Sequence, residues 1–176
     1  MKIIKTKFKD LRILDKETYQ DSRGFFRELY LKKYFKEELI FDIMSLSKKN
    51  VIRGLHLQTK NPQAKFVTVM RGKIFDVCLD CRKKSKTFGK YFGVILSEKK
   101  NQSLFIPKGF AHGFCTLSDK TIVHYKCSNY RDKNSEVGIL WNDKDLNIKW
   151  PIKKGVISDK DKKNYSFKDF KKKYLD

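Results

Sequence analysis

One stretch decides the fold class of this chain of 176 residues: Lys65-Phe66-Val67-Thr68-Val69-Met70-Arg71-Gly72-Lys73-Ile74-Phe75-Asp76-Val77. Its two halves are rich in the β-branched and aromatic residues that favour strands. The two residues Arg71-Gly72 between them predict a β-hairpin of 65–70 with 73–77. Similar runs predict further strands at 26–30, 42–47, 51–56, 91–97, 102–106, 112–117 and 121–127. Many short strands without intervening helices predict an all-β sandwich or barrel.

Two amphipathic helices are expected beside these strands, at 31–40 and at 166–175. In the second helix one side is apolar and the other carries lysines; the apolar residues are Phe167, Phe170, Tyr174 and Leu175. The chain has no internal repeat and no linker rich in Pro or Gly, so we expect a single domain over residues 1–176. Its lysine-rich end, 153–176, is expected to form a basic C-terminal arm over the barrel.

The chain is strongly basic, with 41 Lys and Arg against 20 Asp and Glu. Such a charge attracts anions, including phosphorylated substrates and nucleic acid. However, 34 of the basic residues are lysines spread over the whole chain, whereas arginine is the usual residue for reading phosphates and bases. We therefore expect no nucleic-acid partner. No apolar run reaches about 18 residues and no long apolar stretch follows the charged N-terminus, so we expect no membrane partner and a cytoplasmic location.

Neither the cysteines nor the histidines predict a metal site. Cys78 and Cys81 have the spacing of zinc ligands, but they lie in a strand-like run, where positions three apart point to opposite faces. The histidines, His56, His112 and His124, include no close pair on one strand. We expect reduced, partly buried thiols and no metal.

Two of the histidines lie in glycine-containing segments, Asn50-Val51-Ile52-Arg53-Gly54-Leu55-His56-Leu57-Gln58 and Ile106-Pro107-Lys108-Gly109-Phe110-Ala111-His112-Gly113-Phe114. Further motifs are Asp21-Ser22-Arg23-Gly24-Phe25-Phe26-Arg27-Glu28, Ser85-Lys86-Thr87-Phe88-Gly89, Tyr125-Lys126, Gly138-Ile139-Leu140-Trp141-Asn142-Asp143, Ile148-Lys149-Trp150-Pro151 and Ser158-Asp159-Lys160-Asp161. In this order they resemble the dTDP-4-keto-6-deoxyglucose 3,5-epimerase family of nucleotide-sugar enzymes. Collinear motifs over about 140 residues are far more specific than one short pattern.

The resemblance implies a cupin-type β-jelly roll with short peripheral helices, a homodimer formed by strand exchange, and an isomerase that needs no cofactor. The implied substrate is a nucleotide-diphosphate sugar with a ketone at carbon 4. That ketone makes the protons on carbons 3 and 5 acidic. Inverting either carbon requires a base on one face, a group that holds the enolate oxygen, and an acid on the other face.

The resemblance assigns these catalytic roles to four residues. His56 resembles the base, because imidazole titrates near neutral pH, and Asp161 resembles the carboxylate that orients it. Lys65 shares the inner face of its strand by alternation, and a cation there suits an enolate. Tyr125 resembles the general acid, since a phenol stays protonated at neutral pH. Without the resemblance, Lys65 would be interpreted as a surface lysine and Tyr125 as a packing residue.

The resemblance also implies substrate-binding residues. Arg23 and Arg53 match positions that contact the diphosphate, for which the guanidinium fork is suited. Tyr130 resembles an aromatic residue that stacks on the base, with Phe26 beside it. His112 aligns with a histidine that contacts the substrate. Other matching positions are Glu28, Glu136 and Lys160.

Two features of the strands qualify this assignment. Strict alternation puts Arg53 and His56 on opposite faces, so Gly54 is predicted to mark a bulge that re-aims one of them. His124 falls on the face opposite Tyr125 and is expected to be structural.

The nucleotide and the number of inverted carbons stay open. Phe41-Asp42-Ile43-Met44 stands where family members commonly carry Gln and Asn to pair with thymine. A GDP- or CDP-linked hexose or heptose is therefore an alternative substrate. A 3-epimerase or a 3,4-ketoisomerase is an alternative enzyme, and a non-catalytic cupin that binds sugars or nucleic acid is an alternative of another class. The whole set of His56, Lys65, Tyr125 and Asp161 argues against a non-catalytic protein, since binding alone needs no acid–base pair.

Overall fold

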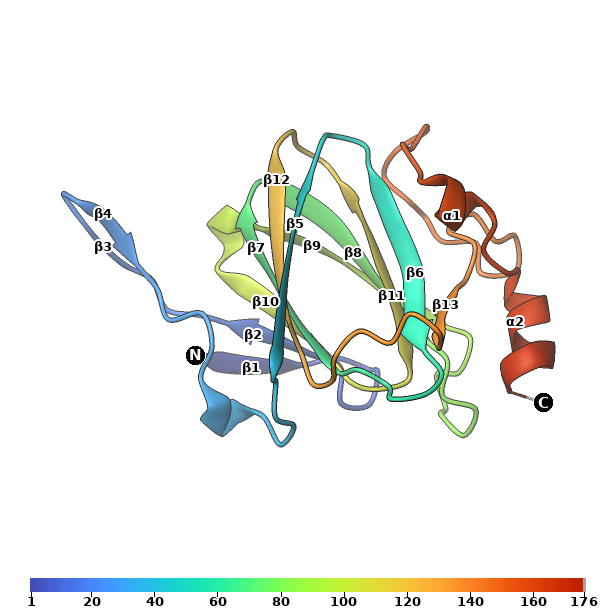
Figure 1. Cartoon of the computed structure of the whole chain (residues 1–176). Helices are drawn as coiled ribbons and strands as arrows, with labels where there is room; N and C mark the ends of the chain where they lie inside the picture. The colour runs from blue at the N-terminus through green and yellow to red at the C-terminus, as the bar shows by residue number, and fades with distance from the viewer. Residues whose placement is uncertain (176) are drawn as a thin grey trace.

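The computed structural model describes residues 1–175, whose strands form two antiparallel sheets around a common interior (Figure 1). The first sheet has the strand order β1 (Lys2–Lys5), β2 (Arg12–Asp15), β10 (Gln102–Ile106), β7 (Lys65–Arg71), β12 (Thr121–Cys127) and β5 (Phe41–Ser47). The second has the order β13 (Glu136–Gly138), β6 (Ile52–Gln58), β11 (Phe110–Thr116), β8 (Lys73–Asp80) and β9 (Tyr91–Ser97). The predicted all-β, cupin-type jelly roll is confirmed.

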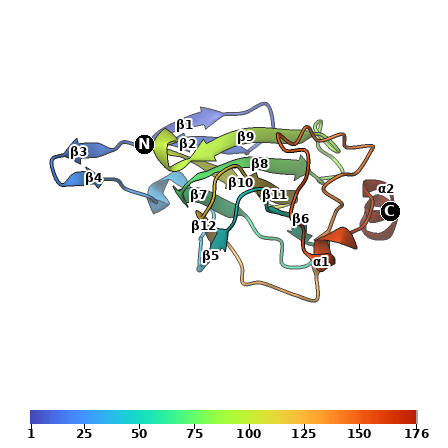
Figure 2. The same cartoon turned by 90° about the horizontal axis from the view of Figure 1, so that it is seen from above.

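The remaining elements lie outside these two sheets. β3 (Tyr19–Asp21) and β4 (Gly24–Phe26) pair with each other in a hairpin that projects away from the body (Figure 1). α1 (Asp159–Lys162) and α2 (Phe167–Tyr174) lie at the opposite end, as the view from above in Figure 2 also shows. Two short 3-10 turns are η1 (Lys32–Tyr34) and η2 (Glu98–Lys100).

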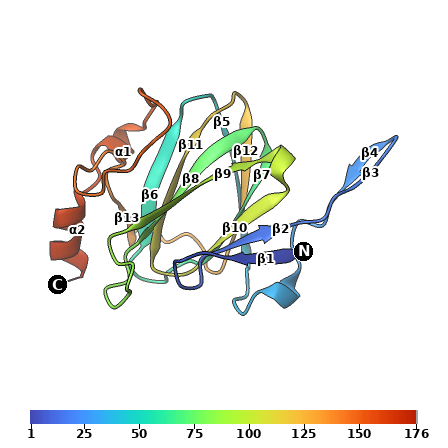
Figure 3. The same cartoon turned by 180° about the vertical axis from the view of Figure 1, so that it is seen from behind.

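The strands predicted at 65–70 and 73–77 exist, but the prediction that they pair in a hairpin is wrong. β7 pairs with β10 and β12, whereas β8 pairs with β9 and β11 in the other sheet, which Figure 3 shows from behind. Gly72 turns the chain from one sheet to the other with a φ of +83°, and a Cβ there would lie 2.5 Å from the Ser118 hydroxyl. Both strands are largely buried on both faces, which explains their nearly continuous apolar sequence.

Three apolar clusters hold the sheets and the C-terminal arm together. The interior cluster joins both sheets and includes Val67, Val69, Leu104 and Val123 from one and Ile74, Cys78, Leu96 and Phe114 from the other. A second cluster lies between β6, β8 and β11 and the C-terminal segment and includes Leu55, Leu79, Phe167 and Phe170. The third includes Leu14, Phe35, Leu39, Phe66 and Phe105. Each fully buried side chain of this size contributes roughly 1.5–3 kcal/mol.

Two predictions for the segment 26–40 are wrong. The predicted strand at 26–30 is limited to Phe26 at the end of β4, and the predicted helix at 31–40 is reduced to η1. Phe35 instead packs edge-on against Phe66, with 5.1 Å between the ring centroids. Packing onto the sheet outweighs the weak helical propensity of this segment. The sequence also does not predict the short elements β1, β2, β3, β13 and α1, each of which has four residues or fewer.

The predicted C-terminal helix is confirmed as α2. Ser166 caps it, because its Oγ accepts a hydrogen bond from the Asp169 N–H at 3.0 Å. Its buried side carries Phe167 and Phe170, which lie in the second apolar cluster. Asp176, the last residue of the predicted arm, lies outside the described residues. Within residues 1–175, no helix has the length and hydropathy that crossing a bilayer requires.

Candidate active site

A cavity of about 320 Å³ lies between the two sheets. The five-stranded sheet contributes Arg53, His56, His112, Gly113, Phe114 and Glu136 to its wall, and the six-stranded sheet contributes Ile43, Ser45, Lys65, Tyr125 and Cys127. Loops and the C-terminal arm add Gln63, Arg131, Ser158, Lys160 and Asp161. This volume is in the range of small-molecule sites, and motifs more than 100 positions apart in the sequence meet in it.

His56 and Asp161 form a hydrogen-bonded pair in this wall. Nε2 of His56 lies 2.6 Å from Oδ1 of Asp161, whose side chain is only 6% exposed. Burial alone would raise the pKa of Asp161, but hydrogen bonds from His56 and from the Gly54 N–H lower it, so the carboxyl stays ionised. An ionised Asp161 accepts the Nε2–H and leaves Nδ1 of His56 as the basic nitrogen.

Local structure fixes both members of this pair. Asp161 is carried by α1, which is capped by Ser158: its Oγ accepts a hydrogen bond from the Asp161 N–H at 3.1 Å. On β6, the register against β11 shifts between the paired positions of Arg53 and His56, so both side chains line the cavity. The predicted bulge at Gly54 is confirmed. Gly54 has a φ of +111°, and a Cβ there would lie 2.6 Å from the backbone of β11, so a side chain does not fit.

Tyr125 and Lys65 face the same cavity from the other sheet. They lie on the neighbouring strands β12 and β7, and the inward direction predicted for Lys65 is confirmed. Burial raises the pKa of Tyr125, and a 3.4 Å contact with the Ser45 hydroxyl offsets this only in part. Burial lowers the pKa of Lys65, although nearby anionic groups favour its charge. A phenol that keeps its proton therefore lies across the cavity from the imidazole of His56.

A second histidine–aspartate pair lies beside the first. Nε2 of His112 is 2.8 Å from Oδ2 of Asp76, and both side chains are buried. His112 is paired in register with His56 on the adjacent strand, and its ring centroid lies 6.1 Å from that of Tyr125. The five-stranded sheet thus presents two neighbouring imidazoles, each bonded to its own carboxylate.

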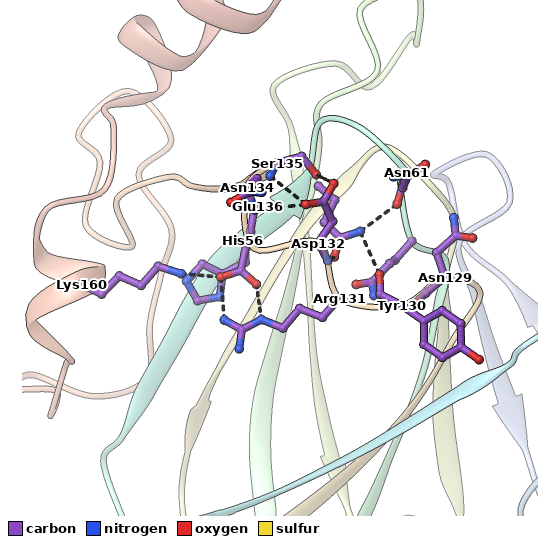
Figure 4. A network of polar contacts seen from close by, with 12 residues as sticks. His56, Asn61, Asn129, Tyr130, Arg131, Asp132, Asn134, Ser135, Glu136 and Lys160 are labelled. Carbon is purple, nitrogen blue, oxygen red and sulfur yellow. Dashed lines mark hydrogen bonds and ion pairs between the residues drawn. The ribbon is translucent and has the colours of Figure 1, made fainter.

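Glu136 is held between two cations in the cavity wall (Figure 4). Arg131 donates to both carboxylate oxygens, at 2.9 and 3.0 Å, and Lys160 of α1 also binds one of them. Burial alone would raise the pKa of Glu136, but Arg131 and Lys160 lower it to about 2. The ion cluster lies beside His56 and joins the loop after β12, β13 and α1.

Not every predicted binding residue lies in this cavity. Arg23, Phe26 and Glu28 belong to the projecting β3–β4 hairpin and the residues after it, and all three are exposed. The Arg23 side chain is 88% exposed and paired only with Asp21 of the same hairpin. Tyr130 is exposed in the loop next to Arg131 and does not line the cavity. One chain therefore assembles the acid–base residues but leaves the arm residues outside its own cavity.

Several residues of the cavity wall are not predicted from the sequence. Ser45 could be found from alternation, because Ile43 and Ser45 face the cavity while Met44 and Leu46 are exposed. Gln63 and Arg131 come from loops, where no periodicity predicts a direction, and they are missed together with Cys127 and Ser158. His124 points away from the cavity and lies 3.1 Å from Asp42.

The cysteines occupy the positions that alternation predicts. Cys78 lies in the interior cluster and Cys81 in the second cluster, so the two thiols are on opposite sides of the sheet. All four thiols are free and buried, and burial raises the pKa of the Cys127 thiol. Among the described residues, no group of three or more His, Cys, Asp or Glu is arranged to hold a metal ion.

The fold and the cavity define a class: a jelly-roll enzyme in which an oriented imidazole faces a protonated phenol, an arrangement suited to moving protons. The profile of the dTDP-4-dehydrorhamnose 3,5-epimerase family matches residues 5–169, and the chain belongs to this family. It is 45% identical to the dTDP-4-dehydrorhamnose 3,5-epimerase of Shigella flexneri, over 96% of this chain and 97% of that protein.

Two solved structures agree with this membership. The dTDP-4-dehydrorhamnose 3,5-epimerase of Elizabethkingia anophelis superimposes with a TM-score of 0.91 at 41% identity, over 96% of this chain and 97% of that one. The dTDP-6-deoxy-D-glucose-3,5-epimerase of Legionella pneumophila, in complex with dTDP-4-keto-L-rhamnose, gives 0.90 at 40% identity, over 94% and 92%. The epimerase family and the isomerase class expected from the motifs are confirmed.

Proposed function

We propose that this protein inverts carbons 3 and 5 of dTDP-4-keto-6-deoxyglucose to give dTDP-4-keto-rhamnose. One observation carries the proposal: His56, bonded to Asp161, and Tyr125 line the same cavity from opposite sheets. The relatives from Shigella and Legionella bear the names of 3,5-epimerases, and the Legionella structure contains dTDP-4-keto-L-rhamnose. A sugar ring between the two side chains would have a base on one face and an acid on the other.

The proposed reaction consists of proton transfers. Nδ1 of His56 takes the proton from the carbon next to the ketone, and the electron pair of that bond moves onto the ketone oxygen as an enolate. Asp161 stabilises the imidazolium, while the Lys65 ammonium stabilises the enolate oxygen. The enolate collapses as Tyr125 gives its proton to the opposite face of the carbon, which inverts the centre. His56 then releases its proton to solvent and the phenolate of Tyr125 takes one up.

Deuterium uptake from solvent tests this function. With dTDP-4-keto-6-deoxyglucose in D2O, the protein should place deuterium at carbons 3 and 5, and NMR should find both centres inverted. Deuterium and inversion at carbon 3 alone would identify a 3-epimerase instead, and a product with its ketone at carbon 3 would identify a 3,4-ketoisomerase. No exchange with any 4-keto nucleotide sugar would refute the proposal.

We propose dTDP as the nucleotide, on the strength of the relatives' names. Ile43 in the wall offers no hydrogen bond to a base, so recognition must come from other groups such as Tyr130. Thermal-shift ranking of dTDP, GDP, CDP and UDP tests this, because the tightest ligand of the native state stabilises most at equal concentration. The largest shift is expected with dTDP, and a larger shift with GDP or CDP would contradict it.

We also propose a homodimer in which the β3–β4 arm of each copy reaches the cavity of the other. β5 is an edge strand of its sheet and exposes Met44 and Leu46, while the arm exposes Phe25 and Phe26. Apolar side chains on an open edge favour pairing with another chain. Each copy would act as one domain of residues 1–176 with 153–176 as its basic arm. Light scattering should give twice 20.9 kDa, and a monomer would contradict the dimer.

A further inference from the structure

Arg131 is a cavity residue to which neither the motifs nor the acid–base chemistry assigns a role. Its guanidinium lines the cavity and binds both oxygens of Glu136, at 2.9 and 3.0 Å. Figure 4 shows its side chain running from the loop beside Tyr130 towards His56. We propose that Arg131 binds the diphosphate of the substrate, an inference that rests on the proposed function.

The order of groups in a nucleotide sugar supports this position. The diphosphate joins the base to the sugar, so it must lie between the two sites that bind them. In the proposed complex the sugar lies between His56 and Tyr125, and Tyr130 contacts the base. Arg131 follows Tyr130 in the chain and directs its guanidinium to the sugar side (Figure 4).

The contact with Glu136 indicates what Arg131 can bind. A guanidinium that holds a carboxylate through two parallel hydrogen bonds presents the fork geometry that also fits two phosphate oxygens. The Arg131 side chain is 48% exposed and its guanidinium can therefore turn to a ligand in the cavity, whereas the Glu136 side chain is only 13% exposed and stays in the wall. Glu136 meanwhile keeps Lys160 as a partner, so its carboxylate is not left unpaired when Arg131 turns to the diphosphate.

The loop that carries Arg131 is held firmly, which lowers the entropic cost of binding. Gln58 accepts a hydrogen bond from the Asp132 N–H at 2.9 Å and donates to the carbonyl of Asn61 at 2.8 Å. The carboxylate of Asp132 in turn accepts the Ser135 hydroxyl at 2.7 Å. A pre-ordered backbone leaves only the Arg131 side chain to be fixed by the ligand.

Binding of dTDP and of thymidine to Arg131→Ala tests the inference. Loss of charge-assisted hydrogen bonds should weaken dTDP binding by about tenfold to a hundredfold, and should leave thymidine binding unchanged because thymidine has no phosphate. KM should rise in parallel, with kcat changed far less. Arg131→Lys keeps the charge but loses the fork of the guanidinium, so its affinity for dTDP should lie between those of Arg131→Ala and the natural protein. Lys133→Ala, an exposed charge in the same loop outside the cavity, is the matched control and should bind dTDP normally.

Each other outcome overturns the inference. Equal dTDP affinity in Arg131→Ala and the natural protein would remove Arg131 from the binding site. Equal losses of dTDP and thymidine affinity would make Arg131 a structural support of the loop. An equal loss of dTDP affinity in Lys133→Ala would mean that any positive charge in this loop has the same effect. None of these results touches the proposed epimerisation, which is tested by deuterium uptake and product stereochemistry with the natural protein.

Discussion

The interior cavity and the β3–β4 arm both carry residues of the family motifs, but those of the cavity are largely buried and those of the arm are exposed. Asp161 in the cavity is 6% exposed and bonded to His56, whereas Arg23 in the arm is 88% exposed and bonded only within its hairpin. Proton transfer needs groups held at fixed distances, and the cavity of one chain holds them. Residues that point into solvent gain a function only when another surface meets them. In the proposed homodimer, the chemistry belongs to one copy and binding is shared between two.

The largest effect is expected in the cavity, from Asp161→Asn. The variant keeps the size of the side chain but loses the charge that orients and stabilises imidazolium, so proton abstraction should slow by roughly 10²–10⁴-fold. The rate of deuterium uptake measures it. Asp159→Asn, an exposed carboxylate on the same helix, serves as control and should exchange at the normal rate. An Asp161→Asn variant as fast as its control would remove the dyad from the mechanism.

The next effect tests the arm, by mixing two inactive variants. If Arg23 serves the partner's cavity, a dimer of one Arg23→Ala chain and one His56→Ala chain has one cavity with both defects and one intact cavity. Random mixing should therefore restore about a quarter of the normal activity, because half of the dimers are mixed and each has one good site. Recovery is measured after unfolding and refolding the two variants together. Mixtures as inactive as the separate variants would place Arg23 at its own cavity, and an Arg23→Ala variant that is itself active would place Arg23 at neither cavity.

A smaller effect concerns the free energy of unfolding, and it compares the ion cluster of Glu136 in the cavity wall with the ion pair of Asp21 in the arm. Glu136 has a pKa of about 2, below its ordinary 4.5, so it stabilises the fold above about pH 4.5 and loses this contribution as the pH falls towards 2. Glu136→Gln should lower the free energy of unfolding by roughly 1–3 kcal/mol at pH 7, and the loss should shrink towards pH 2. Asp21→Asn in the exposed arm pair should leave it unchanged. Urea unfolding at several pH values checks both, and a pH-independent loss in Glu136→Gln would contradict the assignment.

The smallest effect lies at the base of the arm. Lys16 is buried with its Nζ 2.6 Å from the Ser103 hydroxyl, and burial together with nearby Arg27 lowers its pKa to about 8. The unfolded chain therefore binds more protons between about pH 8 and 10.5, and stability from this residue rises with pH across that window. Lys16→Met should remove this rise and add roughly 1–2 kcal/mol at pH 7, since it removes a buried charge at the cost of one hydrogen bond. Thermal unfolding at pH 7 and pH 10 measures it, and an unchanged pH slope would refute the shift.

The sequence predicts strands better than their pairing. β9, β10 and β12 have the predicted bounds, because apolar runs and turn residues are local signals. The predicted hairpin at Gly72 is wrong, because the same types of residue form a two-residue turn within one sheet and a corner that leads from one sheet to the other. The helix expected at 31–40 fails because Phe35 finds a better place on the sheet than a helix would give it.

For the site, too, the sequence predicts the residues on strands better than those on loops. The family motifs point to His56, Lys65 and Tyr125, and strand alternation gives Lys65 its inward direction. Arg131 escapes prediction because the position of its loop depends on hydrogen bonds between that loop and Gln58, which lies more than 70 residues earlier in the chain. The separation of Arg23 from the cavity is a property of how the hairpin leaves the body, which no local pattern encodes.

Tyr125→Phe in D2O tests most directly whether an imidazole and a phenol act on opposite faces of one sugar. His56 should still take and return a proton on its own face, so the recovered substrate should gain deuterium while its configuration stays unchanged. Inverted product formed by Tyr125→Phe at the normal rate would contradict the account, because the second face of the sugar would then have another acid.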